Sequence, residues 1–454
     1  MVGLIVFIAY WYTLYQKRYA ENLFILFLQV TACFQIVPVS LINLNPIITK
    51  PYDWVSLILV ITLIKDYQYI SLRKHIILPL KLYLGFIIFM AFYSIFFLGI
   101  EVKVVVSVFR LYLFFIAPVL FLRYDYKVIE KVVGWIATMI TFCCFIFILQ
   151  AITGKAILSA LQTDNVITKE KVGGFSRFYN LPYFTIFMLM YYVKKLTVKF
   201  DVKLLVYAII IFTAIVVSFN RNSLVTAIIG IIAVFFHNRK LKVTDIALLV
   251  FSGWFLLFII SQIQSKRLNQ GFSDVQSFSN SISLNDVSSN SDVGELSTTQ
   301  FRALHFYERF VYVTNKGLKT TLLGIGMANE NSAIVKKLSF LIGLVDDQNH
   351  TTQIDTADIV WSILLLQTGI IGMVLFTWVF VGYIKFFLKH RKFTFSYLSA
   401  IYLIALLFTS FFGIEITFAP VILFFSMMYV LTAKGTRSFA NVMSSNARLI
   451  KNGI

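Results

Sequence analysis

Hydrophobic segments follow one another along most of this chain, and one long polar stretch interrupts them. Apolar segments run from Val2 to Ile263, a polar stretch extends from about Gln264 to Asp355, and apolar segments then resume until about Thr432. A bilayer core offers no water to satisfy polar groups, so a membrane protein keeps its reactive residues at the interface or in cavities. The pattern therefore predicts a polytopic membrane protein whose functional residues lie on the long polar loop.

The apolar segments are long enough to predict membrane helices. Such a helix needs about 20 apolar residues, and somewhat fewer where long side chains reach the interface. The segments predict an all-α bundle of about 12–13 membrane helices with one large loop subdomain. Those that begin at Trp54 and Tyr183 are the weakest. The candidates are Val2–Tyr15, Phe24–Asn43, Trp54–Ile64, Tyr83–Leu98, Val104–Leu122, Val132–Ala151, Tyr183–Val193, Leu204–Phe219, Leu224–Phe236, Ile246–Ile263, Ile359–Phe387, Tyr397–Phe412 and Thr417–Leu431.

The composition supports an integral membrane protein. Hydrophobic residues make up 59% of the chain and charged residues only 13%, whereas a soluble domain is typically about 25% charged. The net charge of +19 would suggest nucleic acid in a soluble protein, but here Lys and Arg lie in short loops, where they set the orientation. Cys33, Cys143 and Cys144 lie in apolar segments without metal-ligand spacing, so we expect buried thiols and no disulfide framework.

Positive residues alternate between the connections that join the apolar segments. One set of connections is rich in Lys and Arg, whereas the opposite short connections hold only Lys50, Lys103 and Arg221, with none near Glu415. Positive connections stay in the cytoplasm, so the alternation places the C-terminus there and the long loop outside. The positive set is Lys17, Arg18, Lys65, Arg73, Lys74, Lys81, Arg123, Lys127, Lys131, Lys194, Lys195, Lys199, Lys203, Arg239, Lys240, Lys242, Lys385, Lys389, Arg391 and Lys392, with Lys434, Arg437, Arg448 and Lys451 in the tail.

These signals divide the chain into an N-terminal membrane bundle (1–263), an extracytoplasmic loop (264–356), and C-terminal helices with a cytoplasmic tail (357–454). The first segment lacks the basic region of a cleavable signal peptide, so we expect a retained helix with its N-terminus outside. Within the long loop, residues 269–300 are rich in Ser, Asn, Asp and Gly and are predicted to be mobile. Apolar residues at helical spacing in 301–344 predict a helix lying on the membrane face.

That expected helix carries the first candidate site residues. Arg302 and Arg309 are seven residues apart and fall on one face, with His305 between them. Arginine is always charged, and its planar fork matches phosphate oxygens, so this face is a candidate for binding an anionic substrate. The alternative is a solvated helix face that touches lipid headgroups.

Further candidates lie in the other outside connections. His350 lies shortly before a predicted membrane helix and can act as acid, base or hydrogen-bond donor to a sugar hydroxyl, although a lone loop histidine is more often simply exposed. Arg177 ends a Gly-Gly-Phe-Ser-Arg turn in the second-largest outside loop, about Thr153 to Asn180. Arg221 lies in a very short outside turn, and Glu415, in another, is its candidate partner. The alternative for both arginines and for Glu415 is an interfacial anchor.

Two further features admit opposed interpretations. Arg110 lies inside an apolar segment and is a candidate site residue on that ground; it could equally pair with Glu101 or reach the cytoplasmic interface. Asp346 and Asp347 could invite a metal ion, but acidic pairs are common in loops and no DxD spacing is present. We therefore expect neither a metal nor another cofactor.

Three short motifs, in this order, resemble the O-antigen polymerase and ligase superfamily. Ser218-Phe219-Asn220-Arg221-Asn222-Ser223-Leu224 is similar to its Ser-x-x-Arg-x-(Ser/Ala)-Leu signature between two membrane helices. Arg302 followed by Leu322-Leu323-Gly324-Ile325-Gly326 resembles its Arg, helix and Leu-x-Gly-x-Gly pattern. His350 and Asp355, followed by Gly369-Ile370-Ile371-Gly372, resemble its His, acidic residue, helix and glycine pair. The family's Arg followed by ten residues and Gly is absent after both Arg177 and Arg302.

The resemblance implies a GT-C-type membrane glycosyltransferase, most similar to Wzy-type polymerases of bacterial surface polysaccharides. Such enzymes join undecaprenyl-diphosphate-linked oligosaccharides at the outer face of the cytoplasmic membrane into O-antigen or capsule, and need no nucleotide sugar. The implied partners are a flippase and a chain-length regulator, with no nucleic acid. The resemblance implies catalytic roles for Arg302, His350 and Arg177, and substrate-binding roles for Arg221, His305, Arg309, Glu415 and Asp355. The alternatives are an O-antigen ligase that transfers glycan to lipid A–core and a non-enzymatic flippase for the lipid-linked glycan.

Overall fold

The computed structural model of the protein describes residues 2–43, 48–65, 78–159, 167–172, 174–236, 298–343, 351–354 and 359–451. It is mostly helical, at 75%. Within the described residues, five helices are long and apolar enough to cross a membrane, and five shorter apolar helices of 10–17 residues accompany them. The predicted helical membrane architecture is therefore confirmed at this level. The predicted segment Ile246–Ile263 and the Ser/Asn-rich stretch up to residue 297 lie outside the described residues.

The elements follow the predicted apolar segments closely in most places. The helices are α1 (Val2–Tyr15), α2 (Tyr19–Val30), α3 (Val39–Ile42), α4 (Pro51–Lys65), α6 (Leu78–Phe96), α7 (Val102–Tyr112), α8 (Pro118–Phe121), α9 (Tyr126–Thr153), α10 (Thr185–Val198), α11 (Val202–Val217), α12 (Arg221–Phe236), α15 (Thr298–Asn315), α16 (Leu318–Leu323), α17 (Val360–Lys389), α18 (Thr394–Thr409) and α19 (Ala419–Lys451). Short 3₁₀ turns are η1 (Leu113–Ile116), η3 (Val335–Lys337) and η4 (Glu415–Thr417). The strands β1 (Ile167–Val172) and β2 (Phe175–Phe178) form an antiparallel hairpin in the connection between α9 and α10.

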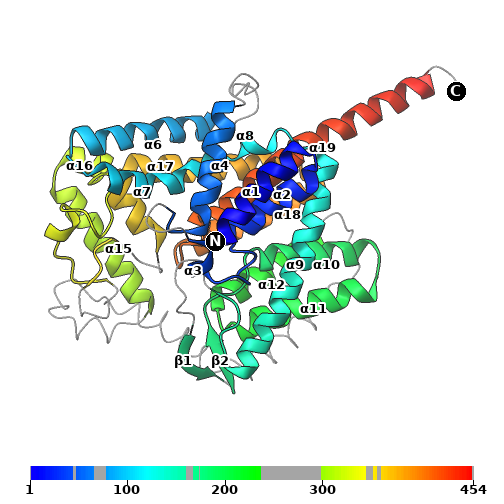
Figure 1. Ribbon diagram of the computed structural model, residues 1–454, viewed down its shortest axis with the longest axis horizontal. Coiled ribbons are helices and arrows are strands. Elements are labelled where there is room, and N and C mark those ends of the chain that lie inside the picture. Colours follow the sequence, from blue (N-terminus) through cyan, green and yellow to red (C-terminus); the bar gives the residue numbers. More distant parts are fainter. Residues whose placement is uncertain are drawn as a thin grey trace.

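The helices pack in two groups that share α18 and α19. In Figure 1, α6, α7 and α17 run beside one another in the upper part of the molecule, and α15 and α16 cover their left ends. Helices α10, α11 and α12 form the second group in the lower right, against α9. One continuous core of buried apolar residues joins the two groups.

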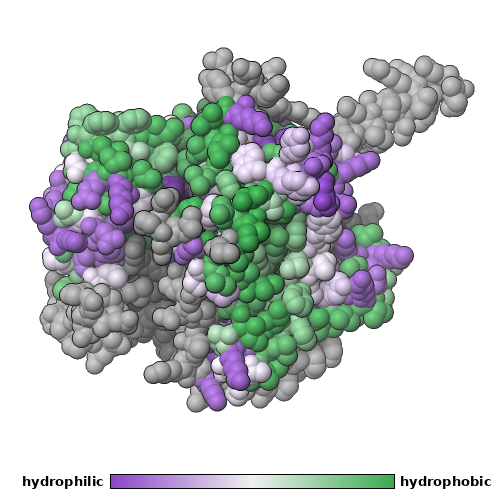
Figure 2. All heavy atoms as spheres, in the orientation of Figure 1, coloured by the Kyte–Doolittle hydropathy of each residue, from purple (hydrophilic) through white to green (hydrophobic). Residues whose placement is uncertain are grey.

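The surface keeps many apolar side chains exposed. Ile8, Phe92 and Phe145 are examples, each about half exposed or more. Figure 2 shows hydrophobic residues over the central surface, whereas hydrophilic residues lie around its margins, with one group at the left near α15 and α16. A contiguous apolar surface of this kind is typical of helices that face lipid. The polar subdomain therefore lies to one side of the apolar body.

The predicted segment Phe24–Asn43 is two helices rather than one. Between α2 and α3 the chain adopts positive φ angles from Ala32 to Gln35. Long-range hydrogen bonds fix this break, because the Ser159 backbone N–H donates to the Gln35 carbonyl at 2.8 Å and the Gln35 amide donates to the Asn180 carbonyl at 3.2 Å. Hydropathy could not predict the break, since the partners lie more than a hundred residues away.

A network of buried amide groups holds the connection between α9 and α10 next to the break between α2 and α3. The Gln150 Nε2 donates to Asn180 Oδ1 at 2.8 Å, and Gln150 Oε1 accepts the backbone N–H groups of Ile157 and Leu158 at 3.2 and 3.1 Å. Asn180 in turn donates to the Leu158 carbonyl at 2.6 Å. One side chain in α9 therefore determines where the loop leaves the helix.

Replacing Gln150 with leucine should destabilise the protein by about 1–3 kcal/mol, because the buried Leu158 N–H and the partly buried Ile157 N–H lose their acceptor. The melting temperature of the detergent-purified protein would measure the loss. The matched control is Gln16→Leu, since Gln16 is exposed at the end of α1. Equal melting temperatures for Gln150→Leu and Gln16→Leu would contradict this role.

The two glycine motifs of the sequence meet in space. Gly324 and Gly369 adopt φ angles of +72° and +63° with nearly extended ψ, a conformation open essentially to glycine alone. The Ile325 N–H donates to the Leu366 carbonyl at 2.7 Å, which joins the end of α16 directly to α17. A Cβ on Gly324 would lie 2.8 Å from the Gly369 nitrogen and in collision with the Leu366 carbonyl oxygen. The segment after α16 therefore packs into the kink of α17 only because Gly324 and Gly369, one on each side of the contact, both lack a side chain.

Candidate functional site

The larger cavity has a volume of about 660 Å³ and lies between α7, η1, the start of α17 and the start of α19. Its size falls within the range of about 300–1,000 Å³ that is typical of small-ligand sites. Apolar side chains form most of the wall. The polar and aromatic side chains in its lining are Lys50, Tyr52, Ser107, Arg110, Tyr112, Phe115, Asn329, Asn331, Thr352, Gln367, Phe376, Thr417 and Phe418.

A charged pair stands at one edge of this cavity. The Arg110 guanidinium contacts Asp53 at 2.8 Å, with both side chains largely buried. The same Asp53 oxygen accepts the backbone N–H groups of Thr49 and Lys50 at 2.9 Å each, which fixes the chain at the start of α4. The partner is Asp53 rather than Glu101, and Arg110, which the sequence also offers as a candidate site residue, lines this cavity. Arg110 also lies 5.6 Å from the centre of the Tyr52 ring.

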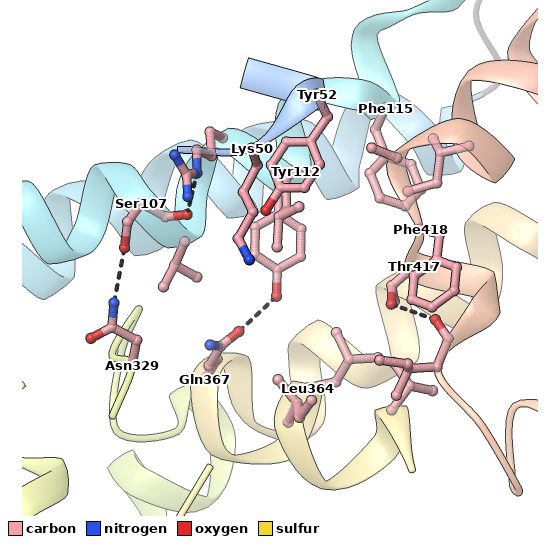
Figure 3. Close-up of a pocket in the computed structure, with 18 of the residues that line it drawn as sticks. Lys50, Tyr52, Ser107, Tyr112, Phe115, Asn329, Leu364, Gln367, Thr417 and Phe418 are labelled. Carbon is pink, nitrogen blue, oxygen red and sulfur yellow. Dashed lines mark hydrogen bonds between the residues drawn. The ribbon is translucent and has the colours of Figure 1, made fainter. Parts of the chain in front are cut away.

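Hydrogen bonds between distant segments shape the rest of the wall. The Tyr112 hydroxyl donates to Gln367 Oε1 at 3.0 Å, and the Gln367 amide donates to the Ala328 carbonyl at 3.0 Å. The Asn329 amide donates to the Ser107 hydroxyl at 3.0 Å. Figure 3 shows these groups around the cavity, with the Lys50 side chain extending into it beside Tyr112. The polar loop and α7 are thus joined across the cavity.

A smaller cavity of about 300 Å³ adjoins the larger one. The two share Ile414 and Phe418, which flank η4, so that this short turn forms a common wall. Its polar and aromatic lining residues are Gln35, Tyr179, Asn180, Tyr183, Phe184, Thr185, Asn220, Asn222, Ser223, Thr226, Tyr402, Thr409, Glu415 and Phe418.

One predicted site residue, Glu415, lines this smaller cavity, and two others, Arg177 and Arg221, lie next to residues that line it. Glu415 lines it, and Asn220 and Asn222 line it on either side of Arg221. The Arg177 guanidinium lies 4.5 Å from the centre of the ring of Tyr179, another lining residue. The connection between α9 and α10, the Arg221 turn and the Glu415 turn therefore meet at this cavity.

Arg302 reaches the same region through Phe412. Its guanidinium lies 5.9 Å from the centre of the Phe412 ring. The Phe412 carbonyl accepts the Asn222 amide at 3.4 Å, and Asn222 is the residue next to Arg221. These contacts connect α15, through Phe412, to the turn that holds Arg221, although Arg302 itself lines neither cavity.

His305 and Arg309 lie elsewhere, buried between α15 and its neighbours. His305 is 1% exposed and its Nδ1 lies 2.9 Å from the Ser362 hydroxyl of α17. Arg309 is 0% exposed, pairs with Glu308 at 2.7 Å and donates to the Gln353 carbonyl at 3.2 Å. The helix face that was predicted to be basic and exposed therefore points inward at His305 and Arg309, where both side chains contact polar groups of the protein itself. Neither side chain is accessible to a substrate in this conformation.

Burial gives His305 a testable pH dependence. Desolvation, with Arg309 nearby as a second cause, lowers the pKa of His305 to about 3. Between the usual histidine pKa near 6.5 and about pH 3, the unfolded chain binds a proton that the folded chain excludes, so stability falls as the pH falls. The loss should reach about 1.4 kcal/mol for each pH unit in that window.

In His305→Gln this contribution should disappear, since glutamine does not titrate. Melting temperatures of both proteins between pH 7 and pH 4.5 would measure it, with a smaller acid-side decrease in the variant. Parallel pH profiles would contradict a neutral, buried His305.

Two predicted site residues, His350 and Asp355, lie outside the described residues, as do Asp346 and Asp347. Among the residues that the structure does describe, no group of three or more His, Cys, Asp or Glu side chains is placed to hold a metal ion.

Sequence reasoning missed most of the larger cavity. Tyr112, Gln367 and Asn329 look ordinary in the sequence, because an isolated Tyr, Gln or Asn in or near an apolar segment has no distinctive pattern. The signal that was available is a pair of charges, Asp53 at the start of one apolar segment and Arg110 inside another, since charges in such places need a partner. Their separation of 57 residues hid the pairing.

Both cavities draw on the same set of connections. Lys50, the 153–180 loop, the Arg221 turn, the Glu415 turn and the long polar loop all contribute lining residues. Within the described part of the chain, no residue of the Lys- and Arg-rich set lines either cavity. The connections that the charge alternation groups together therefore meet in space.

No protein-family model matches this chain, and no curated protein sequence matches it either. What the fold defines is a mostly helical protein with several helices long and apolar enough to span a membrane. Any finer assignment of function depends on the two cavities and on the residues around them.

Proposed function

We propose that this protein is a membrane glycosyltransferase that polymerises undecaprenyl-diphosphate-linked oligosaccharide repeat units. It would act at the outer face of the bacterial cytoplasmic membrane and produce O-antigen or capsular polysaccharide, on a GT-C-like fold. The observation that carries the proposal is the pair of cavities that share Ile414 and Phe418. Polymerisation needs two glycan substrates held side by side, because transfer requires the reacting atoms to approach closely.

The arginines near the smaller cavity are not part of its described lining, but their guanidinium groups suit a diphosphate leaving group. Arg302, with Arg177 or Arg221, would hold the diphosphate of the donor lipid, whose negative charge grows as the glycosidic bond breaks. Fixed cations beside such a group stabilise the transition state through preorganised electrostatics. The Arg fork also matches two phosphate oxygens at once. His350 would position or deprotonate the acceptor hydroxyl, and no nucleotide sugar or metal cofactor is part of this mechanism.

The charge distribution favours this proposal over a flippase. A flippase would be expected to hide its charges within its helices and keep its outside loops short. Here Arg177 lies in β2, Arg221 is the first residue of α12, Arg302 lies in α15 and Glu415 in η4. A further charged pair, Arg110 with Asp53, is largely buried between α7 and α4. A transferase that acts at the membrane surface needs charged residues close to its substrate cavity, as Glu415 and Arg177 are to the smaller cavity.

A deletion strain tests the proposal. Loss of the polymerase should leave one repeat unit on the cell surface, visible as a single band on a glycolipid gel. Loss of a flippase should leave no repeat unit, and loss of a ligase should leave unattached polymer on the carrier lipid. Either of these last two results would replace the proposed function. Complementation with the intact chain is the control.

A further inference from the structure

Gln35 is a buried amide in the wall of the smaller cavity. It lies in the break between α2 and α3, where the backbone adopts positive φ angles, and its side chain is 2% exposed. Within the described part of the chain, its Oε1 atom has no hydrogen-bond partner. Buried polar atoms are nearly always hydrogen-bonded, so an acceptor without a donor in the wall of a cavity indicates where a ligand group would bind.

The orientation of the Gln35 amide is determined by its neighbours. Its Nε2 donates to the Ser159 carbonyl at 3.3 Å and to the Asn180 carbonyl at 3.2 Å. A side-chain amide has two N–H donors and one carbonyl oxygen, so the protein itself uses both donors. The reversed orientation would place Oε1 against two carbonyl oxygens, which cannot donate to it. Gln35 can therefore offer a ligand an acceptor and no further donor.

The backbone around this acceptor is also held in position. The Gln35 N–H donates to the Thr31 carbonyl at 2.8 Å, and the Gln35 carbonyl accepts the Ser159 N–H at 2.8 Å and its hydroxyl at 3.1 Å. Asn180 is held in turn by Gln150 Nε2 at 2.8 Å. A preorganised acceptor loses little entropy when a ligand binds, so this oxygen is well suited to distinguish one ligand from another.

The rest of the lining suits a sugar ring. The volume of about 300 Å³ is at the lower end of the range that is typical of small-ligand sites, which favours a single ring over an oligosaccharide. The C–H faces of a pyranose can pack against aromatic rings, while the hydroxyl or acetamido groups at its edge can donate hydrogen bonds. The aromatic lining residues are Tyr179, Tyr183, Phe184, Tyr402 and Phe418.

We infer that the smaller cavity binds the sugar attached to the donor diphosphate, and that Gln35 Oε1 accepts a hydrogen bond from a hydroxyl or acetamido N–H of that sugar. This inference rests on the proposed function, which supplies the diphosphate-linked sugar. The nearby position of Arg177, 4.5 Å from the centre of the Tyr179 ring, is consistent with a diphosphate beside this cavity. Gln35 is thus a specificity-determining residue for the first sugar of the repeat unit.

Binding to the purified full-length protein in detergent tests the inference. The probes are farnesyl diphosphate alone and farnesyl diphosphate linked to glucose, galactose or N-acetylglucosamine. At least one sugar-bearing probe should bind more tightly than farnesyl diphosphate. The tightest probe is then compared with analogues that each lack one donor. These are the monodeoxy sugars and, for the acetamido group, the 2-O-acetyl ester.

One of these analogues should bind the wild-type protein about 10-fold to 100-fold more weakly than its parent, because Oε1 is then left without a donor. The same analogue and its parent should bind Gln35→Met nearly equally, since methionine has a similar shape but no acceptor oxygen. Loss with a deoxy sugar identifies a hydroxyl as the donor, and loss with the ester identifies the acetamido N–H.

Ser159→Ala is the matched control for general loosening of the break. It removes the hydroxyl that donates to the carbonyls of Gln35 and Val37, and Ser159 is not among the residues that line the cavity. This variant should discriminate between the analogue and its parent as the wild-type protein does. Farnesyl diphosphate should bind all three proteins with similar affinity.

Three results would overturn the inference. One is that no sugar-bearing probe binds more tightly than farnesyl diphosphate, and another is that no analogue loses affinity for the wild-type protein. Both need only the wild-type protein, so they apply even if Gln35→Met does not fold. The third is an equal loss for the analogue in wild type and Gln35→Met. The titrations report on binding and the deletion strain on polymerisation, so either can fail without the other.

Discussion

Replacing Gly369 with alanine should leave little or no correctly folded protein. The φ of +63° and ψ of −168° at this position strain any residue with a Cβ by about 1–3 kcal/mol. The added carbon would lie 2.6 Å from the Gly324 nitrogen and would collide with the Leu322 carbonyl, so overpacking adds about 1–3 kcal/mol more. Since proteins are stable by only about 5–15 kcal/mol in total, this is a large part of the whole.

The measurement is the yield and melting temperature of the protein after detergent extraction, followed by size-exclusion chromatography. Gly134→Ala is the matched control, because a Cβ on Gly134, within α9, meets nothing within 4 Å. Gly324→Ala should resemble Gly369→Ala, since the two glycines contact each other. A Gly369→Ala protein with normal yield and melting temperature would show that the contact between α16 and α17 is not as close as described.

The second large effect is expected for Arg302→Ala, in which long polysaccharide chains should be lost while the protein still inserts and folds. Removing one fixed stabiliser of a developing negative charge typically costs about 10²–10³ in rate. Arg302 is only partly buried, so the substitution should leave the fold intact. Glycolipid gels of a deletion strain that expresses the variant would reveal the chain-length ladder.

Two further variants separate charge from geometry and from general surface effects. Arg302→Lys keeps the positive charge but loses the planar fork, so an intermediate ladder is expected. Lys316→Ala removes an exposed cation just after α15 and should give normal ladders. A normal ladder from Arg302→Ala, at wild-type protein level, would remove Arg302 from the site.

Local hydropathy predicted the helices well where each helix is regular. The long apolar segments at Val132–Ala151 and Ile359–Phe387 correspond to α9 and α17, because a continuous apolar run can satisfy its backbone only as a helix in lipid. It failed where distant partners decide the conformation. The break between α2 and α3 depends on Ser159 and Asn180, and the loop residues 167–178 pair as a hairpin.

For the candidate site, too, local patterns predicted some features and missed those that depend on distant partners. Charge alternation grouped one set of connections, and in the structure Glu415 lines the smaller cavity, Arg177 and Arg221 lie next to residues that line it, and Arg302 is linked to the Arg221 turn through Phe412. The pattern could not show that His305 and Arg309 turn inward, because helical spacing identifies a shared face and not what that face contacts. Nor could it show the larger cavity, which is built from residues far apart in the chain.

The turn η4 has a consequence for how two ligands would influence each other. Phe418 contributes to both cavities, so any ligand that displaces its ring changes the shape of the neighbouring space as well. Thermodynamic linkage makes such an influence mutual, so each ligand alters the affinity for the other by the same factor. Occupancy of one cavity would then be communicated to the other through the two shared residues, Ile414 and Phe418.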